Sequence, residues 1–329
     1  MQPQSILTHT KLEALSLKSQ FQYTIENFEW YDNSRLNIIQ ACKRKAYYTL
    51  MFSGGLGSTT GNGATFGTCV HYANEIYYNN WGRYSETDRR AMAIQAFVRK
   101  HRELFGEDPQ VDTKHTENRG IAILTDYFQR FLAEDPFLRP IDNELRFIIT
   151  IYPEPGDPDY FTMPFLYLGR CDGLWLRERD SSLWIRELKT TSQQASKELE
   201  RLTVDRQPTS YFYSIGQFPL PDQTQLKGII CDVIQVAATK FEAARDYIYK
   251  TPKQILLWRA HTIRLVEHWR EIRDRTDFAS KWSVEKEYYQ ETNECYSKYG
   301  QCPFYQACRF GEEILSSKER NLWNPLTAA

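Results

Sequence analysis

Three ionisable residues in the middle of the chain have a spacing that could support chemistry. Asp172 is followed 15 residues later by Glu187, and Lys189 comes two residues after that. Because side chains alternate along an extended strand, Glu187 and Lys189 point to the same face. If the strands that carry Asp172 and Glu187 pair as a hairpin, two carboxylates and an ammonium group converge on one spot.

Such a group could hold a hard divalent cation. Two neighbouring carboxylates in an apolar strand repel each other unless a cation or a proton lies between them. Mg²⁺ or Mn²⁺ prefers oxygen ligands, lowers the pKa of bound water and stabilises charge on a phosphate undergoing displacement. Lys189 would then orient or help to deprotonate the attacking water. The same spacing also fits Asp172 in a turn, with Glu187 and Lys189 on the solvent face of a strand.

Segments typical of strands carry these three residues. Runs rich in β-branched and aromatic residues predict strands at 145–152, 165–177, 183–189 and 226–236, with a connector of hairpin length at 178–182. Helical periodicity precedes and follows this group, so the sequence predicts an α/β fold with a central mixed sheet flanked by helices. The helices are expected at 34–51 with Ser34 as N-cap, 67–81, 86–105, 117–133, 207–217 and 260–275.

We expect three consecutive regions that form one compact unit. Residues 1–140 are predicted to be a helical region, 141–240 the core with the sheet, and 241–329 a C-terminal helix and a cysteine-rich segment. A glycine-rich stretch at 53–67 predicts a mobile surface loop or lid. It lacks the Gly-Lys-Ser/Thr ending of a phosphate-binding loop.

The composition excludes a global positive field that would attract polyanions. Lys and Arg number 41 against 42 Asp and Glu, which gives a net charge of −1. Any contact with nucleic acid must therefore come from local patches, of which Lys43-Arg44-Lys45 is the best candidate. No apolar run approaches the roughly 18 residues of a membrane span, and the N-terminus lacks a secretory pattern. We expect a soluble, cytoplasmic protein without membrane contact.

Five short motifs occur in the order found in one nuclease family. Gly169-Arg170-Cys171-Asp172-Gly173, followed by Glu187-Leu188-Lys189-Thr190, resembles the core of the PD-(D/E)XK nucleases. The likeness is to the RecB-type branch, which includes CRISPR-associated and phage iron–sulfur exonucleases. Gly67 with His71 resembles that branch's Gly-x-x-x-His motif, Gln207 with Tyr211 its Gln-x-x-x-Tyr motif, and 34–45 its N-terminal motif.

This resemblance implies a restriction-endonuclease-like core with a metal-dependent active site. It implies that His71, Asp172 and Glu187 hold Mg²⁺ or Mn²⁺ and that Lys189 assists the attacking water. The remaining motif residues would contact DNA or support the active site; they are Gln207 and Tyr211.

Three further residues near these motifs have alternative interpretations. Without the resemblance, His71 is more often a packed or surface residue than a ligand. Glu144, at the start of the first predicted strand, could contact the site, but we expect it to be a solvated strand end. Pro208 fits a helix only if the helix starts close to it, because a proline in a helix interior costs about 3 kcal/mol.

Seven cysteines in a chain without a secretory pattern favour thiols or metal ligands over disulfides. Four thiolates satisfy a [4Fe–4S] cluster or a tetrahedral zinc ion, although reduced structural thiols remain an alternative. In iron–sulfur members of the RecB-type branch, one early and three late cysteines bind the cluster. The residues in those places are Cys42, Cys295, Cys302 and Cys308, and the six residues between the first two late cysteines depart from the usual two. Cys69, Cys171 and Cys231 are expected to be buried.

Taken together, these features predict a metal-dependent deoxyribonuclease. The resemblance favours an exonuclease on single-stranded or end-containing DNA, with a setting in recombination, repair, or CRISPR or phage DNA processing and with protein partners from those processes. It also implies a prokaryotic or phage origin. A non-catalytic DNA-binding or assembly factor that retains the fold is the alternative, and a redox-sensing role for a cluster is a third. RNA as substrate stays open.

Overall fold

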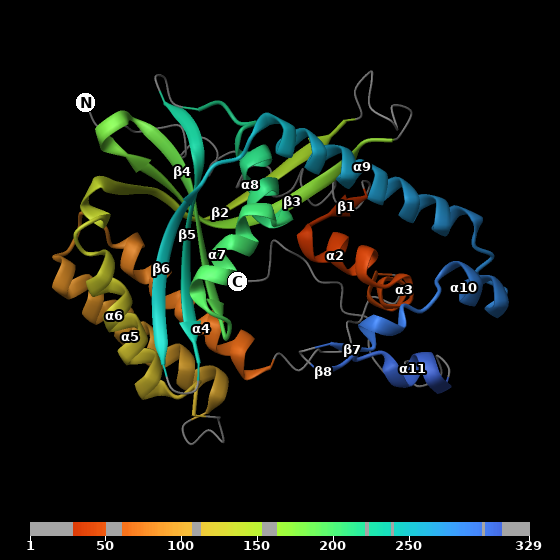
Figure 1. Cartoon of the computed structure of the whole chain (residues 1–329), viewed down its shortest axis with the longest axis horizontal. Coiled ribbons are helices and arrows are strands. Elements are labelled where there is room, and N and C mark those ends of the chain that lie inside the picture. Colours follow the sequence, from red (N-terminus) through yellow and green to blue (C-terminus); the bar gives the residue numbers. More distant parts are fainter. Residues whose placement is uncertain are drawn as a thin grey trace. The chain divides into compact units, whose positions relative to one another are not determined.

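The computed structural model describes residues 29–50, 61–106, 113–152, 163–220, 224–237, 240–297 and 300–310 (Figure 1). The chain divides into two units with interleaved segments. The first unit comprises residues 1–27, 61–148 and 169–255, and the second comprises 28–60, 149–168 and 256–329. Two strands, β2 (Leu138–Ile151) and β3 (Phe165–Arg177), contribute residues to both units.

The first unit contains a mixed sheet, as the sequence predicts. Strand β3 pairs antiparallel with β4 (Ser182–Thr191), β4 pairs parallel with β5 (Gln225–Val236), and β5 pairs antiparallel with β6 (Phe241–Ile248). Strand β2 pairs with β3. The predicted strand at 165–177 is confirmed at both ends, and those at 183–189 and 226–236 are each confirmed to within two residues. A single 3-10 turn, Glu178–Asp180, closes the predicted β3–β4 hairpin.

Helices cover both faces of this sheet, which confirms the predicted α/β class (Figure 1). One face packs against α4 (Asn62–Asn79) and α6 (Glu117–Phe131), on which α5 (Glu86–Phe105) packs, and the other against α7 (Ala195–Val204) and α8 (Arg206–Ile215). The core between α4–α6 and the sheet is rich in aromatic side chains, among them the fully buried Trp175 and Trp184. Large buried rings supply much of the apolar area that stabilises a domain.

The second unit is mainly helical. It contains α2 (Asn33–Ala41), α3 (Lys43–Leu50), most of α9 (Pro252–Arg275), α10 (Lys281–Glu287) and α11 (Tyr305–Phe310). Strand β1 (Trp30–Tyr31) pairs parallel with the first residues of β3, and β7 (Tyr296–Ser297) pairs with β8 (Gly300–Gln301). None of the helices described here is both long and apolar enough to cross a membrane.

Several local expectations differ from the structure. The predicted helix 34–51 is two helices, because Cys42 is extended between α2 and α3, and its N-cap is Asp32 rather than Ser34. Of the predicted glycine-rich loop, residues 62–67 are the first turns of α4, whereas 53–60 lie outside the described residues. The sequence patterns also gave no indication of α7, β6 or α10. These are short elements whose formation depends on packing against the rest of the fold.

Candidate active site

Asp172, whose side chain is 16% exposed, is the carboxylate at the centre of the candidate site. On β3, its Oδ2 accepts a hydrogen bond from the backbone N–H of Leu188 at 2.6 Å, and its Oδ1 lies 3.2 Å from Nδ1 of His71 on α4. Burial opposes ionisation of Asp172, but His71, Lys189 and the Leu188 N–H together lower its pKa below the usual range. Asp172 is therefore held as a carboxylate although it is largely buried.

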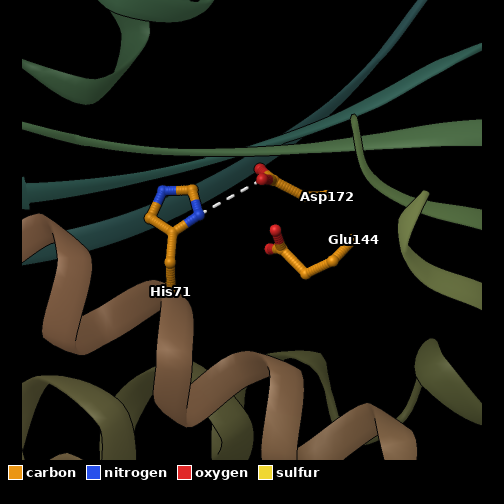
Figure 2. Close-up of side chains that lie close together, drawn as sticks. All are labelled: His71, Glu144 and Asp172. Atoms are coloured by element: carbon orange, nitrogen blue, oxygen red, sulfur yellow. Dashed lines mark ion pairs between the residues drawn. The ribbon is translucent and has the colours of Figure 1, made fainter. Parts of the chain in front are cut away.

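His71 and Glu144 join Asp172 in one cluster. One ligand atom from each of the three residues lies within 4.8 Å of the other two, and Figure 2 shows their side chains pointing toward one another. Burial alone would lower the pKa of His71, but the Asp172 carboxylate raises it. An imidazole and two carboxylates offer nitrogen and oxygen ligands that could hold a divalent cation.

The expectation that Glu144 is a solvated strand end is wrong. Glu144 lies within β2, its side chain is 19% exposed, and it forms an ion pair with Arg170 at 2.9 Å between Oε2 and Nε. Its φ of 53° is a left-handed conformation that few residues other than glycine adopt. Burial and the neighbouring Asp172 charge raise the pKa of Glu144 to about 7. The sequence pattern missed it because neither this backbone conformation nor the pair with Arg170 is local in sequence.

Glu187 and Lys189 form the second half of the site on β4. Lys189 Nζ lies 2.5 Å from Oε1 of Glu187 and donates a hydrogen bond to Oε1 of Gln207 at 2.9 Å. Gln207 in turn donates from Nε2 to the hydroxyl of Tyr211 at 2.6 Å. The pair Glu187–Lys189 shares one face of β4, as alternation predicts. This chain of contacts fixes the Lys189 ammonium group from α8.

Glu187 is near Asp172 but is not part of the cluster with His71. It is 2% exposed, and burial and the Asp172 charge raise its pKa to about 7 although Lys189 opposes the rise. Among the described residues, the atoms within 4.8 Å of one another come from His71, Glu144 and Asp172. The geometry therefore offers Glu144 as a metal ligand that the sequence pattern did not, in addition to the predicted Glu187.

Two motif glycines and one proline occupy positions that suit them. A Cβ on Gly67 would lie 2.7 Å from Oγ1 of Thr190, and a Cβ on Gly169 would lie 2.2 Å from the ring of Phe147. The latter ring also packs edge-on against Tyr211. Pro208 is the third residue of α8, where its missing N–H has no partner within the helix, and Asp205 is the N-cap.

The four cysteines predicted to bind metal line one cavity of the second unit. Cys42, Cys295, Cys302 and Cys308 surround it together with Gln290, whose Nε2 lies 2.8 Å from Sγ of Cys295. Among the described residues, no three cysteine sulfurs lie within 4.8 Å of one another. Burial raises the pKa of Cys308 to about 12, so without a metal this thiol stays protonated. The other three cysteines, Cys69, Cys171 and Cys231, are buried as expected.

The predicted basic surface patch is not present as such. Lys43 is 7% exposed and its Nζ donates to the carbonyl of Ile39 at 2.9 Å, while Arg44 is 9% exposed and donates to the carbonyl of Glu285 at 3.2 Å. Buried cations that already bond carbonyl groups are not available to phosphates. Of the three residues, only Lys45 is partly exposed, and it lies beside the cysteine cavity.

Comparison with known proteins identifies a family-level match. The model of the family described as the PD-(D/E)XK nuclease superfamily matches residues 33–309. A search of curated proteins gave no match. A solved structure titled "Crystal structure of SSO0001" aligns with 66% of this chain and 78% of its own at 11% identity, with a TM-score of 0.26.

Substitution of Glu144 tests which carboxylates hold a cation. If His71, Asp172 and Glu144 form the binding set, Glu144→Gln weakens Mn²⁺ binding by at least about tenfold, since lost ligands or their supports typically weaken binding 10- to 100-fold. Isothermal titration calorimetry with Mn²⁺ measures this. Glu187→Gln is compared in parallel, and Glu178→Gln, on the exposed hairpin turn, is the control. Unchanged affinity in Glu144→Gln would exclude Glu144 as a ligand.

The raised pKa values of Glu144 and Glu187 predict that cation binding depends on pH. Below about pH 7 these carboxyls are protonated in the metal-free protein, and a cation must displace those protons. Mn²⁺ affinity should therefore rise from pH 6 to pH 8, and binding near pH 7 should release protons. Titration in buffers of different ionisation enthalpy gives the number released. Zero release at pH 6.5 would contradict the prediction.

Proposed function

Because this chain belongs to the PD-(D/E)XK nuclease superfamily, we propose that it is a metal-dependent deoxyribonuclease acting on single-stranded or end-containing DNA. The observation that carries this proposal is the placement of Asp172 beside both His71 and the Glu187–Lys189 pair. A carboxylate that stays ionised, a second carboxylate of high pKa and a fixed ammonium group are the groups that phosphodiester hydrolysis needs.

Each residue has a distinct task in this proposal. Asp172 and His71, with Glu144, Glu187 or both, hold Mg²⁺ or Mn²⁺. When bound, the ion lowers the pKa of a water and neutralises charge on the phosphate. Lys189 orients that water, and its contacts with Glu187 and Gln207 keep the ammonium group in place. Tyr211 supports Gln207 through the hydrogen bond between them.

Several features favour an active nuclease over a DNA-binding factor that only retains the fold. Keeping three carboxylates close together and partly or fully buried is unfavourable unless a cation is bound there. An assembly factor without catalysis has no need to retain Glu187, Lys189 and the Gln207 support. We further propose an exonuclease of the RecB-type branch that processes DNA inside the cell in recombination, repair, or CRISPR or phage pathways.

Loss of Lys189 is the direct test of the catalytic role. Lys189→Ala should lower Mn²⁺-dependent cleavage of DNA by at least about 100-fold, a typical contribution of a positioned acid–base or electrostatic group. DNA binding should survive because Lys189 is engaged with Glu187 and Gln207 in the free protein. Gels of 5′- and 3′-labelled single- and double-stranded DNA measure cleavage and its polarity.

Controls separate this proposal from its alternative. Asp172→Ala should be inactive with Mn²⁺ and Mg²⁺, and wild type should be inactive in EDTA. Glu178→Gln, on the exposed hairpin turn, should cleave like wild type. If wild type binds DNA and Mn²⁺ yet cleaves no substrate, the assembly-factor alternative replaces the nuclease. Cleavage of RNA in place of DNA would correct the substrate class.

We also propose a [4Fe–4S] cluster in the cysteine cavity. Four thiolates bound to one zinc ion at about 2.3 Å lie roughly 3.8 Å apart. The sulfurs of Cys42, Cys295, Cys302 and Cys308 line one cavity, but no three of them in the described chain come within 4.8 Å. Four thiols that line one cavity can hold a cluster whose metal atoms lie between the sulfurs, as in the iron–sulfur proteins that the sequence resembles. N–H groups near the sulfurs, such as that of Gln290, would bond cluster thiolates.

Metal analysis tests the cluster directly. Protein purified without oxygen should contain about four iron atoms and four sulfides per chain, as a [4Fe–4S] cluster requires, with broad visible absorbance that disappears on oxidation. Cys302→Ser should lose iron and melt at a lower temperature, because metal binding contributes to folding. Cys231→Ser, a buried cysteine of the first unit, is the matched control and should keep its iron. One zinc and no iron would favour the zinc alternative.

A further inference from the structure

Arg170 is an exposed cation next to the carboxylate cluster. It lies on β3 two residues before Asp172, and its side chain is 50% exposed. Its Nε is 2.9 Å from Oε2 of Glu144, whose carboxylate shares the cluster with His71 and Asp172. Among the described residues, Glu144 is the ion-pair partner that the structure gives Arg170. The guanidinium group of Arg170 therefore contacts a carboxylate that could bind the proposed cation.

The other cations of the site are already engaged. Lys189 is 25% exposed and contacts Glu187 and Gln207, and His71 faces Asp172. A guanidinium group carries five N–H donors in a planar fork, and the pair with Glu144 uses Nε. The two terminal nitrogens match the geometry with which arginine binds phosphate oxygens through two parallel hydrogen bonds.

The charge balance of the site calls for such a group. Glu144 and Asp172 lie in one cluster, and Glu187 lies on the strand that pairs with the strand of Asp172, so these three carboxylates would repel an approaching phosphodiester when they are ionised. A divalent cation offsets part of this charge at the bond that breaks. A phosphate on either side of that bond still approaches acidic groups, and a partly exposed guanidinium group can offset their repulsion.

We propose that Arg170 binds a backbone phosphate of the polynucleotide next to the bond that is cleaved, using the terminal nitrogens of its guanidinium group. This inference rests on the proposed nuclease function and names a substrate contact that the family motifs do not assign. Arg170 keeps its Nε pair with Glu144 and so fixes that carboxylate while its outer edge holds the strand. A plain surface ion pair, by contrast, would contribute little to stability and nothing to substrate binding.

Salt dependence of DNA binding tests the contact without cleavage. For a fluorescent single-stranded oligonucleotide in Ca²⁺, the logarithm of the affinity falls linearly with the logarithm of the salt concentration. Loss of one phosphate contact should reduce that slope by about 0.7 in Arg170→Ala. Arg139→Ala is the matched control, because Arg139 is a partly exposed arginine of the same unit paired with Glu178 at 3.2 Å. Its slope should equal that of wild type.

Cleavage of modified DNA locates the contacted phosphate. Single methylphosphonates, which remove one phosphate charge, are placed at each position around the cleaved bond. In wild type one flanking position should reduce kcat/KM by about 10- to 100-fold, the size of a hydrogen bond to a charged group. Arg170→Ala should be slower by a similar factor with unmodified DNA, and should be insensitive to the modification at that position. Arg170→Lys should fall between the two.

The outcomes distinguish this inference from the proposed function. If wild type does not cleave but Arg170→Ala lowers the salt slope, the nuclease proposal fails and the phosphate contact stands. If wild type cleaves and Arg170→Ala keeps both its salt slope and its full methylphosphonate profile, the contact is refuted. Circular dichroism and thermal unfolding of each variant confirm that it folds, and Arg170→Gln provides a second variant of similar length.

Discussion

The site depends on a charged pair that is buried on the opposite face of the sheet. Nε of Arg186 on β4 lies 3.2 Å from Oδ2 of Asp232 on β5, and a second nitrogen donates to Oδ1 of Asn74 on α4 at 2.8 Å. The two charged side chains are at most 2% exposed, so any movement that separates them leaves the Arg186 charge in the interior without its carboxylate, although Asp232 keeps its pair with Arg245. Breaking such a pair typically costs about 3–5 kcal/mol. This constraint fixes α4 against the sheet, and α4 carries His71 less than one turn before Asn74.

Because side chains alternate along β4, this strand carries the buried Arg186 on one face and the site residues Glu187 and Lys189 on the other. Arg186 and Leu188 face α4 to α6, whereas Glu187 and Lys189 face the site and the helix that carries Gln207. The backbone N–H of Leu188 adds a hydrogen bond to Asp172. Because the peptide units are rigid, the buried pair on one face sets the position of the carboxylate and ammonium groups on the other. A small displacement of β4 would thus alter both at once.

The site residues that the sequence predicts are those whose positions depend on neighbouring residues in the chain. Alternation put Glu187 and Lys189 on one face, and the hairpin brought Asp172 to the same place because its connector is short. For Glu144 the prediction is wrong, because its position depends on a left-handed φ within β2, which the sequence pattern does not indicate, and on the pairing of β2 with β3. The basic run 43–45, in which Lys43 and Arg44 are buried, is likewise not the surface patch that the sequence predicts. A run of basic residues predicts a surface, but carbonyl groups of Ile39 and Glu285 bind these side chains inside the second unit.

The backbone conformation and the surroundings of Glu144 favour cation binding. Glu144 keeps an unfavourable backbone conformation of the kind that costs about 1–3 kcal/mol and that persists only where the surroundings enforce it. Its carboxyl group also has a raised pKa because it is buried beside Asp172. Folding alone therefore imposes both the backbone strain and the charge repulsion at Glu144. A bound cation would remove the charge repulsion between the carboxylates. Because folding already holds these side chains in place, little conformational entropy would be lost on binding.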